Sequence, residues 1–216
     1  MIAARTIRVS ILAILLFQVA ALIAREFLRL RLGAIGIGGG SAKDLSYLVV
    51  PVVLGTLMWP ILKQQSAHLR HVLRRDALTW RIVACGVLAG ALLQATWWTQ
   101  AAVLRGVSAA PVRLDCTDAW QLFLGLVVMV LITPLIEEVI NRGLLTSALL
   151  HFGTWPAVLV SSILFAVMHS PTGAAFAFFA GLILALQYLH TGAVWLSLVT
   201  HLTYNGLVQL GRFCIA

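Results

Sequence analysis

Apolar residues run through this chain in stretches long enough to cross a lipid bilayer. A membrane helix needs about 17–25 predominantly apolar residues. Because hydrocarbon offers no water to the backbone N–H and C=O groups, a spanning segment of this kind must be helical. The pattern predicts an all-α, polytopic transmembrane helical bundle of about seven spans, within a range of six to eight. These spans are residues 7–24, 45–62, 82–103, 119–150, 155–169, 173–189 and 193–210.

Composition leaves little room for a separate soluble domain. The 216 residues are 61% hydrophobic and 10% charged, whereas a soluble domain has about 25% charged residues. We therefore expect residues 1–216 to form a single integral membrane domain. The net charge of +8 is spread over the inter-helix segments. That distribution argues against nucleic acid as a partner and favours contact with the lipid bilayer.

Charge also gives an expected orientation. The most basic inter-helix segment is Lys63–Arg81, and the excess of Lys and Arg in cytoplasmic loops places it in the cytoplasm. Residues 104–118 then face the opposite side. The first apolar run has no small-residue cleavage site and is followed by Arg25, so we expect a retained helix rather than a signal peptide.

Two adjacent glutamates interrupt the longest apolar stretch. Glu137 and Glu138 lie between Phe123 and Leu145, a run that is otherwise almost wholly apolar. An ionisable residue in hydrocarbon costs at least ~2.5 kcal/mol, so an adjacent pair indicates a functional site. Glu138 and Arg142 are four residues apart and can pair on one helix face. Glu137 is rotated about 100° from Glu138 and has no such partner.

Other polar residues lie in later spans at a similar depth. His201 and Asn205 are four residues apart and face the same way, and Phe165 can pack beside the ring of His169. Depth follows from a rise of about 1.5 Å per residue, counted from the turns near 151–154 and 190–192. It is about 22 Å for Glu137, about 25 Å for His169, about 15 Å for His201 and about 21 Å for Asn205. These groups therefore share one slab of the membrane.

The chemistry of such a cluster centres on water. A desolvated carboxylate without a paired cation suits a general base that takes a proton from water. A histidine can position that water or donate a proton to a leaving group, and an Asn amide with a second imidazole can stabilise an oxyanion. No serine or cysteine is paired with the histidines at an obvious spacing. Activated water, rather than a covalent intermediate, is therefore the expected chemistry.

The polar residues form three motifs, which are Glu137-Glu138-x-x-x-Arg142, Phe165-x-x-x-His169 and His201-x-x-x-Asn205. In order, spacing and placement on separate spans, they resemble the motifs of the CPBP family. This is the CAAX-protease and bacteriocin-processing group, also called Abi, of intramembrane endopeptidases. The resemblance covers roughly residues 120–210, and it implies that 119–210 is a catalytic helical core.

The resemblance implies a catalytic role for four residues. Glu137 would be the general base that activates water. His169 would orient the water or assist proton transfer. His201 and Asn205 would form the oxyanion hole.

It also implies structural support from Glu138, Arg142 and Phe165, which surround the catalytic residues. The family is of the glutamic type, so the resemblance implies no metal and no other cofactor. The sequence agrees, because two histidines and one carboxylate could ligate a metal but the chain lacks an HExxH helix.

The short gap from His169 to His201 leaves room for one intervening helix. This resembles the compact bacterial members of the family, which implies a multi-pass protein of the bacterial inner membrane. The expected substrate is a membrane protein or a lipidated or tethered peptide, and no oligomeric state follows from the sequence. Two uses stay open, namely maturation or sorting of exported proteins and CAAX-type processing.

Two other classes of function compete with a protease. A proton-coupled transporter could use Glu137 and the histidines as a relay, although the spans show no internal repeat. A non-catalytic membrane interaction or immunity protein could also be built on the same scaffold. For Glu138 and Arg142, the simpler interpretation is a buried ion pair that fixes helix packing.

Overall fold

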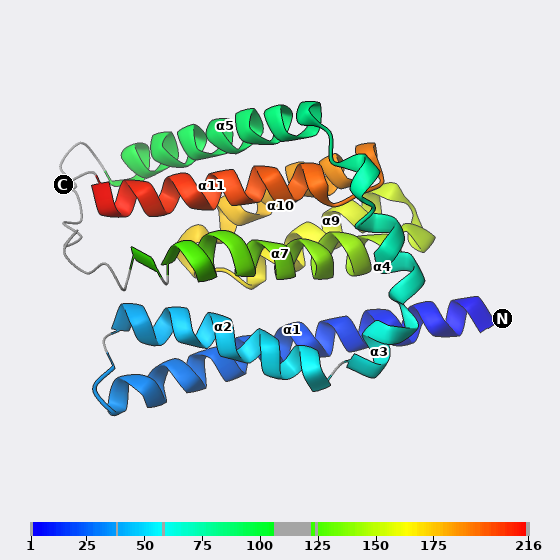
Figure 1. Ribbon diagram of the computed structural model, residues 1–216, viewed down its shortest axis with the longest axis horizontal. Coiled ribbons are helices and arrows are strands. Elements are labelled where there is room, and N and C mark those ends of the chain that lie inside the picture. The colour runs from blue at the N-terminus through cyan, green and yellow to red at the C-terminus, as the bar shows by residue number, and fades with distance from the viewer. Residues whose placement is uncertain (1, 38, 58, 106–121, 124, 215–216) are drawn as a thin grey trace.

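The computed structural model describes residues 2–37, 39–57, 59–105, 122–123 and 125–214 (Figure 1). Within these ranges the chain is helical and contains no strand, which confirms the all-α prediction. The long helices are α1 (Ile2–Ala34), α2 (Gly39–Leu57), α5 (Trp80–Arg105), α9 (Thr154–Val167), α10 (Pro171–Thr191) and α11 (Trp195–Cys214).

Shorter helical elements fill the remaining described segments. Between α2 and α5 lie α3 (Trp59–Gln64), α4 (Ser66–Val72) and η1 (Arg75–Ala77). The predicted fourth span is built from η2 (Gly125–Ile132), α7 (Thr133–Glu138), η3 (Val139–Thr146), α8 (Ser147–Leu149) and η4 (Leu150–Phe152).

The fourth span is irregular on both sides of the glutamate pair. Pro134 lies in the first turn of α7, where its ring and its missing N–H disturb the preceding helical hydrogen bonds. Both η2 and η3 have the wider π-helical winding, in which hydrogen bonds join residues five apart. The Thr146 hydroxyl accordingly donates to the carbonyl of Asn141, five residues earlier, at 2.6 Å. The irregularity expected near Pro134 is therefore a pair of wider π-helical segments, η2 and η3, on the two sides of α7.

Each predicted span falls on a helical segment, but the first prediction ended too early. We expected residues 7–24, whereas α1 continues to Ala34. Glu26 and Arg29 pair along its surface at 2.8 Å, and no glycine or proline interrupts the chain before Gly33. The expected start of the fourth span, 119–121, and most of the 104–118 segment lie outside the described residues.

By length and composition, three of the described helices can cross a membrane. They cover Ile11–Ala34, Trp80–Thr99 and Gly173–Thr191. Large apolar side chains such as Leu16, Leu88 and Val167 are mostly exposed on the outside of the bundle. Lipid tails are the surroundings that such an apolar exterior requires.

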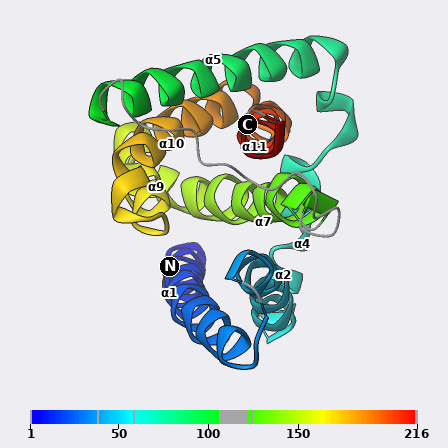
Figure 2. The ribbon, with the colours of Figure 1, turned by 90° about the vertical axis from the view of Figure 1, so that its left-hand side faces the viewer.

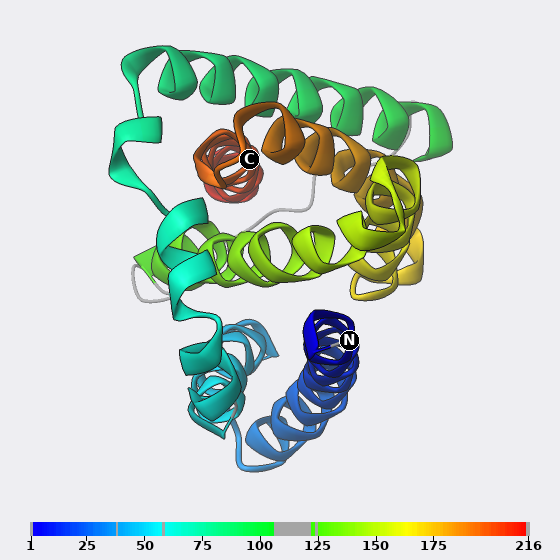
Figure 3. The same ribbon diagram turned by 90° about the vertical axis from the view of Figure 1, so that its right-hand side faces the viewer.

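α11 forms the centre of the helical core. It lies lengthwise in Figure 1 and is seen end-on in Figures 2 and 3, with α5 on one side and α7 on the other. α10 also packs against α11, and α9 packs against α10. The α1–α2 hairpin forms a separate layer on the far side of α7 (Figures 2 and 3). The fourth span is therefore enclosed between α11 and this hairpin.

Two glycines let α5 approach α11 closely. A Cβ atom on Gly86 would lie 2.6 Å from Cγ1 of Val199, and one on Gly90 would lie 2.6 Å from the carbonyl oxygen of Thr200. Glycines four residues apart are a recurrent solution for helix contact in membranes, because they let two backbones meet. This crossing holds α11 in place one residue before His201.

The basic segment closes one end of the bundle. His68 Nε2 donates to the carbonyl of Gly143 at 2.6 Å. The N–H of Val194 donates to the carbonyl of Val72 at 3.1 Å, and Trp195 Nε1 donates to the carbonyl of Arg74 at 2.8 Å. These bonds join α4 and the residues after it to η3 and to the start of α11, so the segment fixes how these helices enter the bundle.

Replacing Gly90 by alanine should destabilise the protein. The added methyl group would overlap the Thr200 backbone, and overpacking of this kind typically costs about 1–3 kcal/mol. Thermal unfolding in detergent measures the effect. Gly55→Ala is the matched control, because a Cβ on Gly55 in α2 meets nothing within 4 Å. If the two variants had the same melting temperature, the close contact between α5 and α11 at Gly90 would be contradicted.

Candidate active site

Glu138 is fully buried between a cation and an imidazole. Its Oε2 lies 3.5 Å from Nε of Arg142, as the four-residue spacing predicts. Its Oε1 accepts a hydrogen bond from Nδ1 of His201 at 3.0 Å. The side chains of Glu138 and Arg142 are 0% exposed and that of His201 is 6% exposed. The carboxylate is thus compensated from two helices, and it is not reachable from outside.

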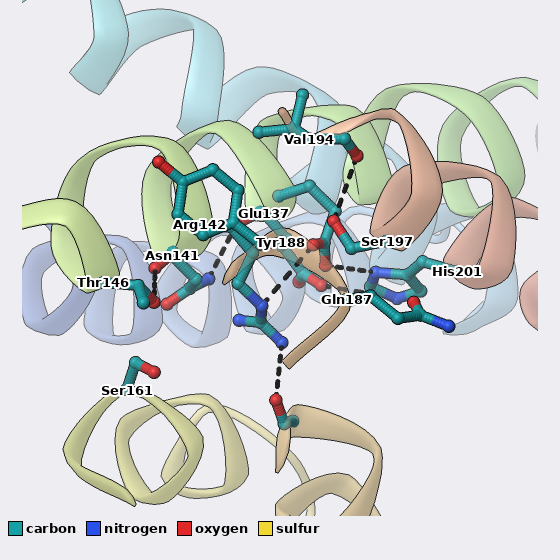
Figure 4. Close-up of polar contacts among 12 residues, drawn as sticks. Glu137, Asn141, Arg142, Thr146, Ser161, Gln187, Tyr188, Val194, Ser197 and His201 are labelled. Carbon is teal, nitrogen blue, oxygen red and sulfur yellow. Dashed lines mark hydrogen bonds and ion pairs between the residues drawn. The ribbon is translucent and has the colours of Figure 1, made fainter. Parts of the chain in front are cut away.

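Arg142 connects this pair to the neighbouring helices (Figure 4). Its Nη2 donates to the carbonyl of Gly181 on α10 at 3.5 Å. Its guanidinium lies over the ring of Phe165 on α9, 4.8 Å from the ring centre. A cation over an aromatic face is stabilised by the ring quadrupole. The charge pair therefore ties the fourth span to α9, α10 and α11 at once.

Glu137 approaches the other side of the same imidazole. Its Oε2 lies 3.8 Å from Nε2 of His201, and its side chain is 21% exposed. With Glu138 accepting the Nδ1 proton, a neutral His201 ring presents an Nε2 lone pair toward Glu137. Two acceptors at this distance need a proton or a water molecule between them. The geometry therefore supplies a place where a proton can be shared by Glu137 and His201.

A cavity of about 50 Å³ opens beside Glu137. Its lining does not include Glu138, His169, His201 or Asn205. The volume is several times the roughly 10–15 Å³ that one water molecule requires. Its walls come from α1, α2, α7, η3 and α9, and most of the lining side chains are apolar, including Phe17, Ile136 and Met168. The exposed member of the glutamate pair therefore faces a space that can hold water.

His169 and Phe165 lie together at the end of α9, as their spacing predicts. Their ring centres are 4.6 Å apart, and the Phe165 ring is also 5.8 Å from that of His201. Nδ1 of His169 donates to the Phe165 carbonyl at 2.7 Å. This bond fixes the tautomer and leaves Nε2 of the exposed His169 ring as an acceptor.

Asn205 has a partner that the sequence did not indicate. Its Nδ2 donates to the carbonyl of Met129 in η2 at 2.8 Å. In the π-helical spacing of η2, the natural partner of that carbonyl is the N–H five residues later, at Pro134, where no N–H exists. Asn205 thus satisfies a carbonyl that the proline leaves free. The second hydrogen on Nδ2 stays available for another acceptor.

Asn141 is a further polar residue at this site that motif reasoning missed. Its Nδ2 donates to the carbonyl of Glu137 at 2.9 Å, and its Oδ1 accepts from Nε2 of Gln18 at 2.6 Å. Asn141 thereby joins α1 to the residue that faces the cavity. Its position four residues after Glu137, in the same apolar run, was the available signal.

The two carboxylates do not form a metal-binding group. Among the described residues, no cluster of three or more His, Cys, Asp or Glu side chains could hold a metal ion. Glu137 and Glu138 approach different nitrogens of His201, which point away from each other on the ring.

Comparison with known proteins places this site in a family. Residues 119–207 match the family model described as Rce1-like, type II CAAX prenyl endopeptidase. The matched segment is 89 of the 216 residues long. No curated protein and no solved structure matched the chain.

The match confirms the resemblance to the CAAX-protease group. The Rce1-like segment contains all the predicted site residues, from Glu137 to Asn205, and leaves α1 to α5 outside it. A match to this family implies a protease and, together with the apolar helices, supports an integral membrane protein.

Removing the buried cation should strongly destabilise the protein. Arg142→Met would leave the buried carboxylate of Glu138 without its cationic partner, and breaking a buried pair in this way typically costs about 3–5 kcal/mol. Denaturant unfolding in detergent measures it. Arg29→Met is the control, because it breaks the exposed Glu26–Arg29 pair, worth about 0–1 kcal/mol. If both variants lost a similar free energy of unfolding, the buried Glu138–Arg142 pair would contribute no more to stability than the exposed Glu26–Arg29 pair.

The Asn205 bond should depend on Pro134. Asn205→Ala would leave the Met129 carbonyl unsatisfied, at a cost of about 1–3 kcal/mol. In a Pro134→Ala background, the restored N–H can bond that carbonyl, so the same substitution should cost less. A double-mutant cycle in the free energy of unfolding measures the coupling between the two sites. Strictly additive effects would refute this account of Asn205.

Proposed function

We propose that the chain is an intramembrane endopeptidase that uses water activated by Glu137. It would hydrolyse a peptide bond near a membrane-embedded or membrane-tethered C-terminal segment. The observation that carries the proposal is the unequal surroundings of the two glutamates. Glu138 is sealed against Arg142, whereas Glu137 lines the cavity and lies within reach of His201.

Glu137 would act as the general base. It takes a proton from a water molecule in the cavity, and the water oxygen forms a bond to the scissile carbonyl carbon while the carbonyl oxygen becomes an oxyanion. The carbon–nitrogen bond then breaks, and the proton held by Glu137 passes to the leaving nitrogen. Both partial reactions require the carboxylate to be accessible, which favours Glu137 over the enclosed Glu138.

His201 and Asn205 would stabilise the oxyanion. A proton on Nε2 of His201 can be donated to the developing negative charge while Nδ1 stays bonded to Glu138. Asn205 keeps one amide hydrogen after bonding Met129. His169 would orient the water through its Nε2, since its Nδ1 is already bonded to the Phe165 carbonyl.

The wider context of the enzyme is also part of the proposal. Residues 1–216 would form one multi-pass domain of the bacterial inner membrane, and 119–210 would be its catalytic core. Maturation or sorting of exported proteins and CAAX-type processing are both compatible with a cavity whose lining is mostly apolar.

The two glutamates should respond differently to substitution. Glu137→Gln should lower peptide cleavage by about 10²–10⁴-fold, the range expected for loss of a general base, without loss of fold. Glu138→Gln should lower the melting temperature, because it removes the charge opposite Arg142. Cleavage of a panel of membrane-tethered C-terminal peptides by the purified protein in detergent measures the first effect.

Each protein would be assayed with and without a chelator. Cleavage that survives chelation and is lost in Glu137→Gln supports the glutamate mechanism. Cleavage abolished by chelation, or retained in a folded Glu137→Gln variant, contradicts it. Loss of ion flux in Glu137→Gln, with no cleavage of any peptide by the wild type, would instead indicate a transporter.

A further inference from the structure

Thr133 is a buried residue whose hydroxyl has no hydrogen-bond partner in the described part of the chain. The residue is 7% exposed. It is the first residue of α7, and it lines the cavity beside Glu137. A buried hydroxyl left unpaired destabilises a fold, because its bonds to water are lost and not replaced. A threonine at this position therefore indicates a partner that enters the cavity.

The missing bond is unusual for a threonine in a helix. Helical threonines commonly donate to a carbonyl one turn earlier, and the buried hydroxyls of Thr146 and Thr200 bond to carbonyls of their own segments at 2.6 and 2.9 Å. The carbonyl four residues before Thr133 is that of Met129, which lies in the wider turns of η2 and accepts from Asn205 at 2.8 Å. Rotation about one bond can turn the Thr133 hydroxyl toward the cavity.

Thr133 and Glu137 lie on the same face of α7. They are four residues apart within this helix, so their Cβ atoms are about 5–6 Å apart. Helical side chains lean toward the N-terminus, which directs the carboxylate of Glu137 over the turn that begins at Thr133. A water molecule bonded to two oxygens at about 2.8 Å each joins groups up to about 5.6 Å apart. One water therefore fits between the hydroxyl and the carboxylate.

The rest of the cavity leaves these two groups to hold a water molecule. Gln18 and Asn141 also line it, but they bond to each other at 2.6 Å, and Asn141 donates to the Glu137 carbonyl as well. A buried water needs two or more polar partners. A carboxylate can accept about four hydrogen bonds, so the approach of Glu137 to His201 leaves capacity for this water.

We propose that the Thr133 hydroxyl holds the nucleophilic water against Glu137. The proposal rests on the proposed endopeptidase function and adds a residue to its machinery. The hydroxyl donates its hydrogen to one lone pair of the water oxygen, and Glu137 takes one of the two water protons. The other lone pair forms the bond to the scissile carbonyl carbon, while the second hydrogen stays on that oxygen. Holding the water in this way removes part of the entropic cost of the attack.

The test compares Thr133→Val with Thr133→Ser. Valine has nearly the same shape without the hydroxyl, so kcat for membrane-tethered C-terminal peptides should fall by about 3–10-fold, the range of one neutral hydrogen bond. KM should stay unchanged, because the lost bond is to water and not to the peptide. Serine keeps the hydroxyl and should keep most of kcat. A valine variant with wild-type kcat, or a serine variant that loses as much as valine, would overturn the proposal.

Thermal unfolding in detergent separates this role from a structural one. Because the Thr133 hydroxyl has no partner among the described residues, Thr133→Val should leave the melting temperature unchanged or raise it. Thr146→Val is the matched control, since it removes a buried hydroxyl that is bonded to the Asn141 carbonyl. It should lower the melting temperature by about 2–4 °C. If Thr133→Val melted as low as this control, the hydroxyl would support the fold and the proposal would fail.

Two further results separate this proposal from the proposed function. If Glu137→Gln abolishes cleavage and Thr133→Val keeps the wild-type kcat, the protease function stands and the role of Thr133 is refuted. A crystal structure grown from a lipid phase tests the water site without any cleavage. A water within about 3.2 Å of both the Thr133 hydroxyl and a Glu137 carboxylate oxygen, absent from Thr133→Val, supports the site. A Thr133 hydroxyl bonded only to its own helix, with no such water, refutes it.

Discussion

The buried charge of Glu138 is the constraint around which the site is organised. A carboxylate removed from water is tolerated only when other groups compensate it. Here the compensation comes from Arg142 on one side and His201 on the other. Because Arg142 also contacts Gly181 and the Phe165 ring, one charge fixes the relative positions of the fourth span, α9, α10 and α11.

Adjacent glutamates acquire different properties from this single arrangement. Successive side chains on a helix diverge by about 100°, so burying Glu138 against Arg142 turns Glu137 toward the cavity. His201 lies between them and presents one ring nitrogen to each. The buried carboxylate of Glu138 holds the imidazole in orientation, and the carboxylate of Glu137 lines the cavity.

Much of this could be predicted from local rules. Long apolar runs predict helices because hydrocarbon excludes every other backbone arrangement. The Glu138–Arg142 pair followed from a spacing of four, and counting residues from the turns placed Glu137 and His201 at similar depth. The count put the two residues about 7 Å apart in depth, and their side chains approach to 3.8 Å.

Other features depend on tertiary contacts that spacing does not contain. The bond from Asn205 to Met129 arises because wide turns and Pro134 leave a carbonyl free. The predicted end of α1 came too early. Charged residues such as Arg25 and Glu26 are typical of the edge of a loop, and the sequence alone does not show that a neighbouring helix packs against them. The close crossing at Gly86 and Gly90 depends on a partner surface on α11 that the four-residue glycine spacing does not identify.

The cavity has walls from two separate parts of the chain. Glu137 and Phe165 lie in the family segment 119–207, whereas Phe17, Ala21 and Arg25 come from α1, which precedes that segment. The hairpin of α1 and α2 therefore completes a cavity whose glutamate comes from the family segment. Substitutions in α1 can therefore change the shape and charge of the cavity without touching the contacts among Glu138, Arg142 and His201.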